Sequence, residues 1–160
     1  MNSSLAKLGS AGDRAEAADV VAELRHQHAR IIELIGELGR SADDRRLAKL
    51  MELREYMIMH ETAEQVVVRP VISEILGEPA ELDEGDECVA LAACCDGEKR
   101  AFMGRQLRAA ETGMRDPGTA DRVEPLNVIV ERTYRAIRAE TGKLSSRRRP
   151  RRRAARGRRW

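Results

Sequence analysis

The chain is poor in aromatic side chains, in histidine and in long apolar runs. Of its 160 residues only 2% are aromatic, and histidine and cysteine occur three times each. Few β-branched runs are present, which gives little support to a sheet. The abundance of Ala, Leu, Glu and Arg instead favours helices packed on helices, and the length predicts one domain.

Neither a disulfide framework nor a membrane segment is expected. Among the three cysteines, Cys94 and Cys95 are adjacent and could join only through a strained ring, while Cys88 would be left over. No stretch approaches the roughly 18 uninterrupted apolar residues of a membrane span, and residues 1–12 lack the apolar segment of a signal peptide. The sequence therefore predicts a cytoplasmic protein that does not contact the membrane.

Charge is divided between two regions of opposite sign. Nine of the 29 basic residues are arginines at positions 147–160, where no acidic residue occurs, so the rest of the chain holds 20 basic against 27 acidic residues. So charged a segment, with so few apolar side chains, is not expected to fold alone. We divide the chain into a flexible leader (1–15), a helical domain (16–144) and a disordered arginine-rich tail (145–160).

The arginine-rich tail allows several interpretations. It can track phosphates and so make weak, non-specific, salt-sensitive contacts with nucleic acid, because only Trp160 is available to stack on a base. It can equally dock on the acidic helical domain of its own chain or on another acidic partner. A frame change in the gene would also produce such a run.

Four helices are predicted from apolar residues that recur at steps of three and four. They cover about 16–39, 43–75, 87–111 and 121–144, with breaks that contain glycine, proline and acidic residues. Pro70 is expected to kink or loosen the end of the second helix. Short connections between helices of this length favour an all-α, up-down-up-down four-helix bundle.

Polar residues lie on the inward stripes of the first two helices. These stripes are Val21, Leu24, His28, Ile31, Ile35 and Leu38, and then Leu47, Leu50, Leu53, Met57, His60, Glu64 and Val67. His60 and Glu64 point the same way because they are one turn apart. A carboxylate in a bundle core needs a positive partner, which a cation shared with His28 would supply. Imidazole with carboxylate suits iron, manganese or zinc. His26 lies about 200° from His28 around the helix and should face solvent.

The same two helices resemble the first half of a hemerythrin-like HHE cation-binding domain. The residues that carry the resemblance are Asp19-Val20-Val21, Leu24, His28, Ile31 and Leu34, then His60-Glu61-Thr62-Ala63-Glu64, Val67 and Pro70. The match covers about 16–75. It implies a four-helix bundle with a non-haem iron site of one or two ions, and it makes His28, His60 and Glu64 candidate ligands.

The second half departs from that family pattern, which has another His on the third helix and another H-x-x-x-E on the fourth. No histidine follows His60. Alignment with the first half places Asp96 at the position of His28, and Glu140 at the position of His60. Both are oxygen donors, so they are either further ligands or ordinary surface acids.

Two functions follow from these patterns. The first is a metal-binding, hemerythrin-like bundle, with iron as the expected ion, that handles or senses oxygen, nitric oxide or redox state. The alternative is a degenerate helical module without metal, whose basic tail binds nucleic acid or an acidic partner. Serine-based catalysis is not indicated, because no serine lies near a histidine in the pattern, and no catalytic residue is assigned. The patterns do not define an oligomeric state.

Overall fold

The described part of the chain is entirely helical. A computed structural model describes residues 18–77, 84–114 and 123–147, and no strand occurs in these ranges. The leader predicted over 1–15, and positions 148–160 of the arginine-rich tail, lie outside the described residues. None of the helices in the described ranges is both long and apolar enough to span a membrane.

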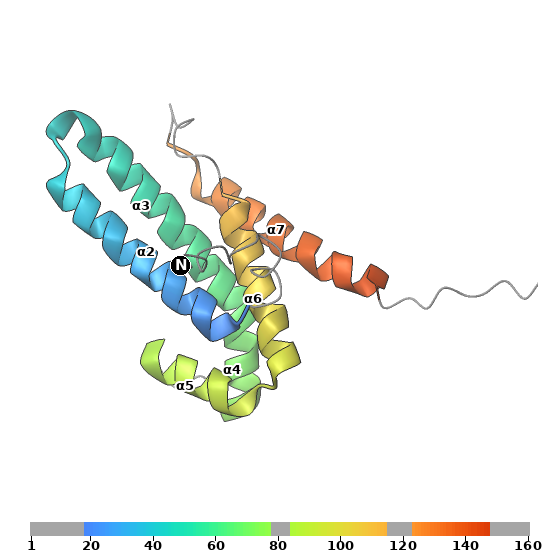
Figure 1. Cartoon of the computed structure of the whole chain (residues 1–160). Coiled ribbons are helices and arrows are strands. Elements are labelled where there is room, and N and C mark those ends of the chain that lie inside the picture. The colour runs from blue at the N-terminus through green and yellow to red at the C-terminus, as the bar shows by residue number, and fades with distance from the viewer. Residues whose placement is uncertain (1–17, 78–83, 115–122, 148–160) are drawn as a thin grey trace, which may run out of the picture.

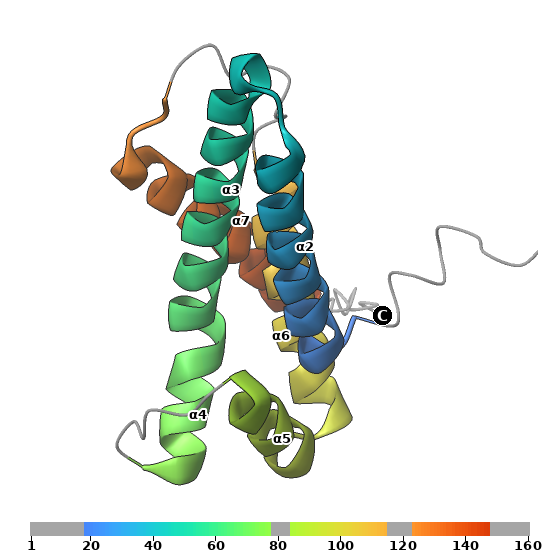
Figure 2. The ribbon, with the colours of Figure 1, turned by 90° about the vertical axis from the view of Figure 1, so that its left-hand side faces the viewer.

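The first two long helices form an antiparallel hairpin. Helix α2 (Val20–Arg40) and helix α3 (Asp43–Ala63) lie side by side and are joined by a two-residue turn (Figures 1 and 2). The helix α2 begins four residues later than the sequence suggests, because the Asp19 side chain caps it by accepting the backbone N–H of Val21 at 2.9 Å. The hairpin brings part of each predicted stripe to one interface, whereas Ile35 of the first stripe is 53% exposed and its predicted burial was wrong.

Pro70 shapes the continuation of α3. The chain passes through a π-helical turn, η1 (Glu64–Val68), into α4 (Arg69–Leu76), which ends at Gly77 with a φ of 82°. The N–H of Arg69 bonds to the carbonyl of Glu64 five residues back, and Pro70 has no N–H to continue an α-helical pattern. The expected loosening near Pro70 is therefore confirmed as a π-turn within one long rod (Figure 2).

The third predicted helix is two helices. Helix α5 (Glu84–Cys94) and helix α6 (Gly97–Thr112) are separated at Cys95 and Asp96. Asp96 has an extended backbone, and its carboxylate accepts the N–H of Lys99 at 2.7 Å, so it is the N-cap of α6. The expectation of one helix over 87–111 was wrong, because this cap starts a new helix in mid-segment.

The four longest described helices pack on one another. Helix α7 (Leu126–Arg147) contacts both α3 and α6, and α6 also contacts α2 and α3. Helix α7 starts five residues after the predicted start at residue 121 and continues three residues beyond the predicted end at residue 144. An all-helical bundle-like core is thus present, with α4 and α5 packed together at one end (Figure 1). The hemerythrin-like up-and-down arrangement stays a prediction.

The core extends from the open end of the hairpin, where α4 and α5 pack, to its middle and does not reach its turn. The side chains of Leu24, Leu34, Met59, Leu91, Leu107 and Ile129 are fully buried. In contrast, Leu47 is 64% exposed, Leu50 44% and Met57 48%, so their predicted burial was wrong. The turn of the hairpin extends past the other described helices (Figures 1 and 2), and Leu47 and Leu50 belong to the first turns of α3, next to it. Met57 lies further along α3, between the buried Tyr56 and Met59, on an exposed face of the helix.

Charged side chains also link α2 and α3. Arg30 of α2 pairs with Glu52 of α3 at 2.9 Å, and Lys49 of α3 pairs with Glu37 of α2 at 2.6 Å. The two pairs add polar links between the two helices. On α7, Thr133 and Ile137 are buried whereas Leu126, at its first position, is 58% exposed.

Candidate metal centre

Three predicted side chains meet at the α2–α3 interface. His28 comes from α2, His60 from the last turn of α3, and Glu64 from the first position of η1. Nε2 of His28 lies 3.1 Å from Nε2 of His60, and Oε1 of Glu64 lies 3.6 Å from the former and 3.5 Å from the latter. In the described part of the chain, this is the group of His, Cys, Asp and Glu side chains whose geometry could hold a metal ion.

The spacing of these three atoms fits one ion. Donor atoms about 2.1 Å from one ion are about 3.0 Å apart at octahedral right angles and about 3.4 Å apart at tetrahedral angles. A point about 2.0 Å from all three atoms lies between them, which is close to metal–ligand distances of about 2.0–2.2 Å. This point lies in the plane of the three donors. An ion about 2.2 Å from each donor would lie roughly 1 Å out of that plane, so its far side would be open to further ligands.

The site is largely shielded from water. The side chain of His28 is 18% exposed, that of His60 9% and that of Glu64 8%. Burial is the largest cause that lowers the pKa of His60 to about 4; the nearby His28 acts in the same direction, and Glu61 opposes the shift. His60 is therefore neutral near pH 7, so a metal ion would not have to displace a proton from an imidazolium.

The two imidazoles hold a defined mutual orientation. Their ring centroids are 4.8 Å apart with an interplanar angle of 85°, an edge-to-face arrangement that directs one Nε2 toward the other. Nδ1 of His60 points away from His28 and lies 3.0 Å from Oε1 of Gln27. Sequence reasoning missed Gln27, although an amide one residue before His28 on a largely apolar helix face was a usable signal.

Asp96 is not brought to this group. Its carboxylate is exposed and accepts the backbone N–H of Lys99 as the N-cap of α6. The alignment that paired Asp96 with His28 assumed a continuous third helix. Since the chain instead starts α6 at Gly97, Asp96 has a structural role that explains its position.

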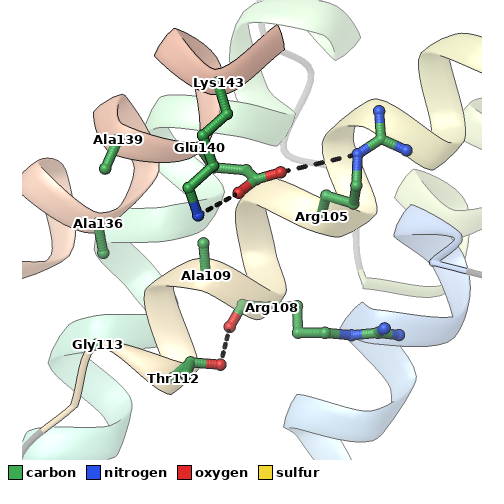
Figure 3. A pocket seen from close by; sticks show the side chains of 9 residues that line it. All are labelled: Arg105, Arg108, Ala109, Thr112, Gly113, Ala136, Ala139, Glu140 and Lys143. Carbon is green, nitrogen blue, oxygen red and sulfur yellow. Dashed lines mark hydrogen bonds and ion pairs between the residues drawn. The ribbon is translucent and has the colours of Figure 1, made fainter. Parts of the chain in front are cut away.

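Glu140 lies beside cationic groups. Its carboxylate is 3.2 Å from Nζ of Lys143 and 3.9 Å from Nε of Arg105, and Figure 3 shows it between these two side chains. The three residues line a cavity of about 440 Å³ between α6 and α7, next to Ala109 and Ala136. Basic side chains thus supply the positive charge that a metal ion would otherwise bring to the carboxylate of Glu140.

His26 faces solvent, as its helical position indicates. Its side chain is 64% exposed, and its Nε2 lies 3.5 Å from a carboxylate oxygen of Glu111 on α6. It belongs to a surface contact and offers a matched control for the two interior histidines.

Comparisons with family models, curated proteins and solved structures found no match. The resemblance to hemerythrin-like domains therefore depends on the residues of the first two helices alone. The possible metal site is formed by the three converging side chains, His28, His60 and Glu64.

Proposed function

We propose that this chain binds one metal ion through His28, His60 and Glu64. The observation that carries the proposal is the triangle formed by their three donor atoms, whose sides of 3.1, 3.5 and 3.6 Å match the spacing around a single ion. These side chains come from two helices and are held at this spacing by the packing of the hairpin. The site needs no large rearrangement to take up a cation.

Electrostatics supports a cation at this position. Glu64 is buried, and burial of a carboxylate is unfavourable unless positive charge or donors compensate it. His60 supplies little positive charge near pH 7, because burial lowers its pKa to about 4. A divalent ion would bring the positive charge and would use the lone pairs of both imidazoles at once.

We propose iron as the ion. Two histidines and one carboxylate on one side of a metal are the ligands of many non-haem Fe(II) sites, although zinc also uses this set. The resemblance to hemerythrin-like domains favours iron over zinc. Bound iron would supply open coordination positions and a redox change, which suits handling or sensing of oxygen, nitric oxide or redox state.

We further propose a mononuclear site. A second ion would need more carboxylate or histidine ligands. The two acids that the sequence alignment offered as such ligands have other contacts, because Asp96 caps a helix and Glu140 pairs with Lys143. A further buried carboxylate on the α6-facing side of α2, that of Glu23, pairs with the guanidinium of Arg108. It therefore has a positive partner without a second ion.

Metal content tests the proposal. The full chain would be purified without a histidine tag, and its metals counted by mass spectrometry beside the variants His60→Ala and Glu64→Gln. We expect about one iron per chain in the wild type and loss in both variants. His26→Ala, the surface control, should keep its metal. A wild-type chain that retains far less than one ion, even after incubation with Fe²⁺, would overturn the proposal.

A further inference from the structure

A single buried amide connects the candidate metal centre to α6. Gln27 is fully buried and belongs to α2. Its Oε1 lies 3.0 Å from Nδ1 of His60 on α3, and its Nε2 donates to the backbone carbonyl of Leu107 on α6 at 3.3 Å. One side chain thus bonds to groups on two neighbouring helices.

These two contacts fix which nitrogen of His60 carries the proton. A carbonyl oxygen only accepts, so the amide group of Gln27 that faces Leu107 must be its NH₂. The Gln27 oxygen then faces Nδ1 of His60, and a bond between them requires the proton on Nδ1. In the neutral ring this leaves the lone pair on Nε2, the atom that faces His28 and Glu64.

We propose that Gln27 is a positioning residue, which selects Nε2 of His60 as a metal donor and holds the ring in the orientation that binding needs. The inference rests on the proposed metal site. Partners of this kind orient metal-bound histidines and commonly change affinity about 10- to 100-fold when removed. Because the amide is itself oriented by Leu107, metal affinity also depends on the packing of α6 against α2.

A purely structural role for Gln27 makes different predictions. Loss of a buried amide that bridges helices would lower the free energy of unfolding without setting a particular histidine tautomer. A positioning role requires that the proton of His60 and the metal affinity change together. The ring nitrogens therefore give a measurement that stability alone does not.

The experiment follows the ring nitrogens of His60 by NMR in the full chain, labelled with ¹⁵N histidine, near pH 7 with chelator. We expect the proton on Nδ1 in the wild type. Gln27→Met, which removes the acceptor at similar volume, should place a share of the proton on Nε2. Gln27→Glu keeps an acceptor and should restore the Nδ1 proton. Thr133→Val, which changes another buried polar residue, should leave His60 unchanged.

The same proteins would be titrated with Fe²⁺ without oxygen and separately with Zn²⁺. Gln27→Met should bind about 10- to 100-fold more weakly than the wild type, and Gln27→Glu within about tenfold of it. A wild-type proton on Nε2 would overturn the inference, and this result needs no variant to fold. Unchanged tautomer and affinity in a folded Gln27→Met would also overturn it.

The outcomes separate this inference from the proposed function. If metal binds equally to the wild type and to Gln27→Met, the site exists and only the positioning role fails. If no ion binds to the wild type, the proposed function and the selection of a metal donor both fail, even where the proton lies on Nδ1.

Discussion

Nε2 of His28 and Nε2 of His60 face each other at 3.1 Å across the α2–α3 interface. Two ring nitrogens this close either share a proton or bind a common ion, because two facing lone pairs would repel. If the proton of His60 is on Nδ1, the metal-free pair holds together through the Nε2 proton of His28. For the Nε2 atom of a neutral His28 to bind an ion, that proton would have to move to Nδ1 of the same ring.

Acid should destabilise the metal-free protein through His60. Its pKa is about 4 in the folded chain against an ordinary 6.5, so between these values the unfolded chain takes up a proton that the folded chain does not. The free energy of unfolding should fall as pH falls from about 6.5 to about 4, by roughly 3 kcal/mol in total. Urea unfolding with chelator, near pH 7 and near pH 4.5, measures the change.

A matched pair of variants isolates this effect from other acid-sensitive groups. His60→Gln should show a smaller loss of stability between the two pH values, whereas His26→Gln should behave as the wild type. Equal pH dependence in all three proteins would contradict the assignment to His60.

Neutralising Glu140 should leave metal binding intact. Glu140 contacts Lys143 and Arg105, so Glu140→Gln should change the metal dissociation constant less than about threefold and stability by less than about 1 kcal/mol. Glu64→Gln should weaken binding by well over tenfold, since it replaces an anionic carboxylate donor by a neutral amide oxygen. Calorimetric titration compares the two carboxylates directly. If Glu140→Gln weakened metal binding as much as Glu64→Gln, Glu140 would be a metal ligand and the prediction would be wrong.

Removing the Asp96 side chain should act on folding alone. Asp96→Ala loses the N-cap of α6 and should lower the free energy of unfolding by about 1 kcal/mol, while Asp96→Asn keeps a capping side chain and most of the stability. Metal affinity should be unchanged in both. Chemical denaturation and metal titration of the same samples check the two statements, and a metal defect in Asp96→Asn would show that the carboxylate binds the ion.

A methyl group at Gly104 should separate α6 from α2. A Cβ there would lie 2.8 Å from the backbone carbonyl carbon of Asp19 and 2.9 Å from that of Ala18. Gly104→Ala should therefore lower the free energy of unfolding by about 1–3 kcal/mol. Since Leu107 follows in the next turn of α6, the variant should also weaken metal binding through Gln27.

Gly142 provides the control for that substitution. A Cβ at Gly142 meets nothing within 4 Å, so Gly142→Ala on α7 should stabilise the helix by roughly 0.5–1 kcal/mol. Urea unfolding distinguishes the two variants by the sign of the change. Equal stability of both would mean that α2 and α6 do not approach as closely as the structure has them.

The spacing of residues along single helices was sufficient to predict which side chains of the site face the same interface. His60 and Glu64 face the same way because they are one turn apart, and the stripe of α2 brings His28 to the same interface. The sequence could not give the 3.1 Å between the two imidazoles, nor the amide of Gln27 behind one of them, because both depend on how α2, α3 and α6 pack together.

The second half was harder to predict because local capping outweighed the pattern. Asp96 and Gly97 interrupt the apolar spacing of residues 88–107, and the chain ends one helix and starts a capped new one at this interruption. Apolar spacing also suggested that Leu47 and Leu50 are buried, whereas burial needs a covering helix, and the described helices do not reach the turn of the hairpin. Periodicity identifies the apolar side of a helix, but only the packing shows how far along that side is covered.

X-ray absorption at the metal edge, on the full chain loaded with one equivalent of Fe²⁺ under anaerobic conditions, tests the central claim most directly. A single ion held by His28, His60 and Glu64 predicts scattering from two imidazoles, oxygen or nitrogen neighbours at about 2.0–2.2 Å, and no metal–metal scattering. Scattering from fewer than two imidazoles, or a clear metal–metal distance, would contradict the account.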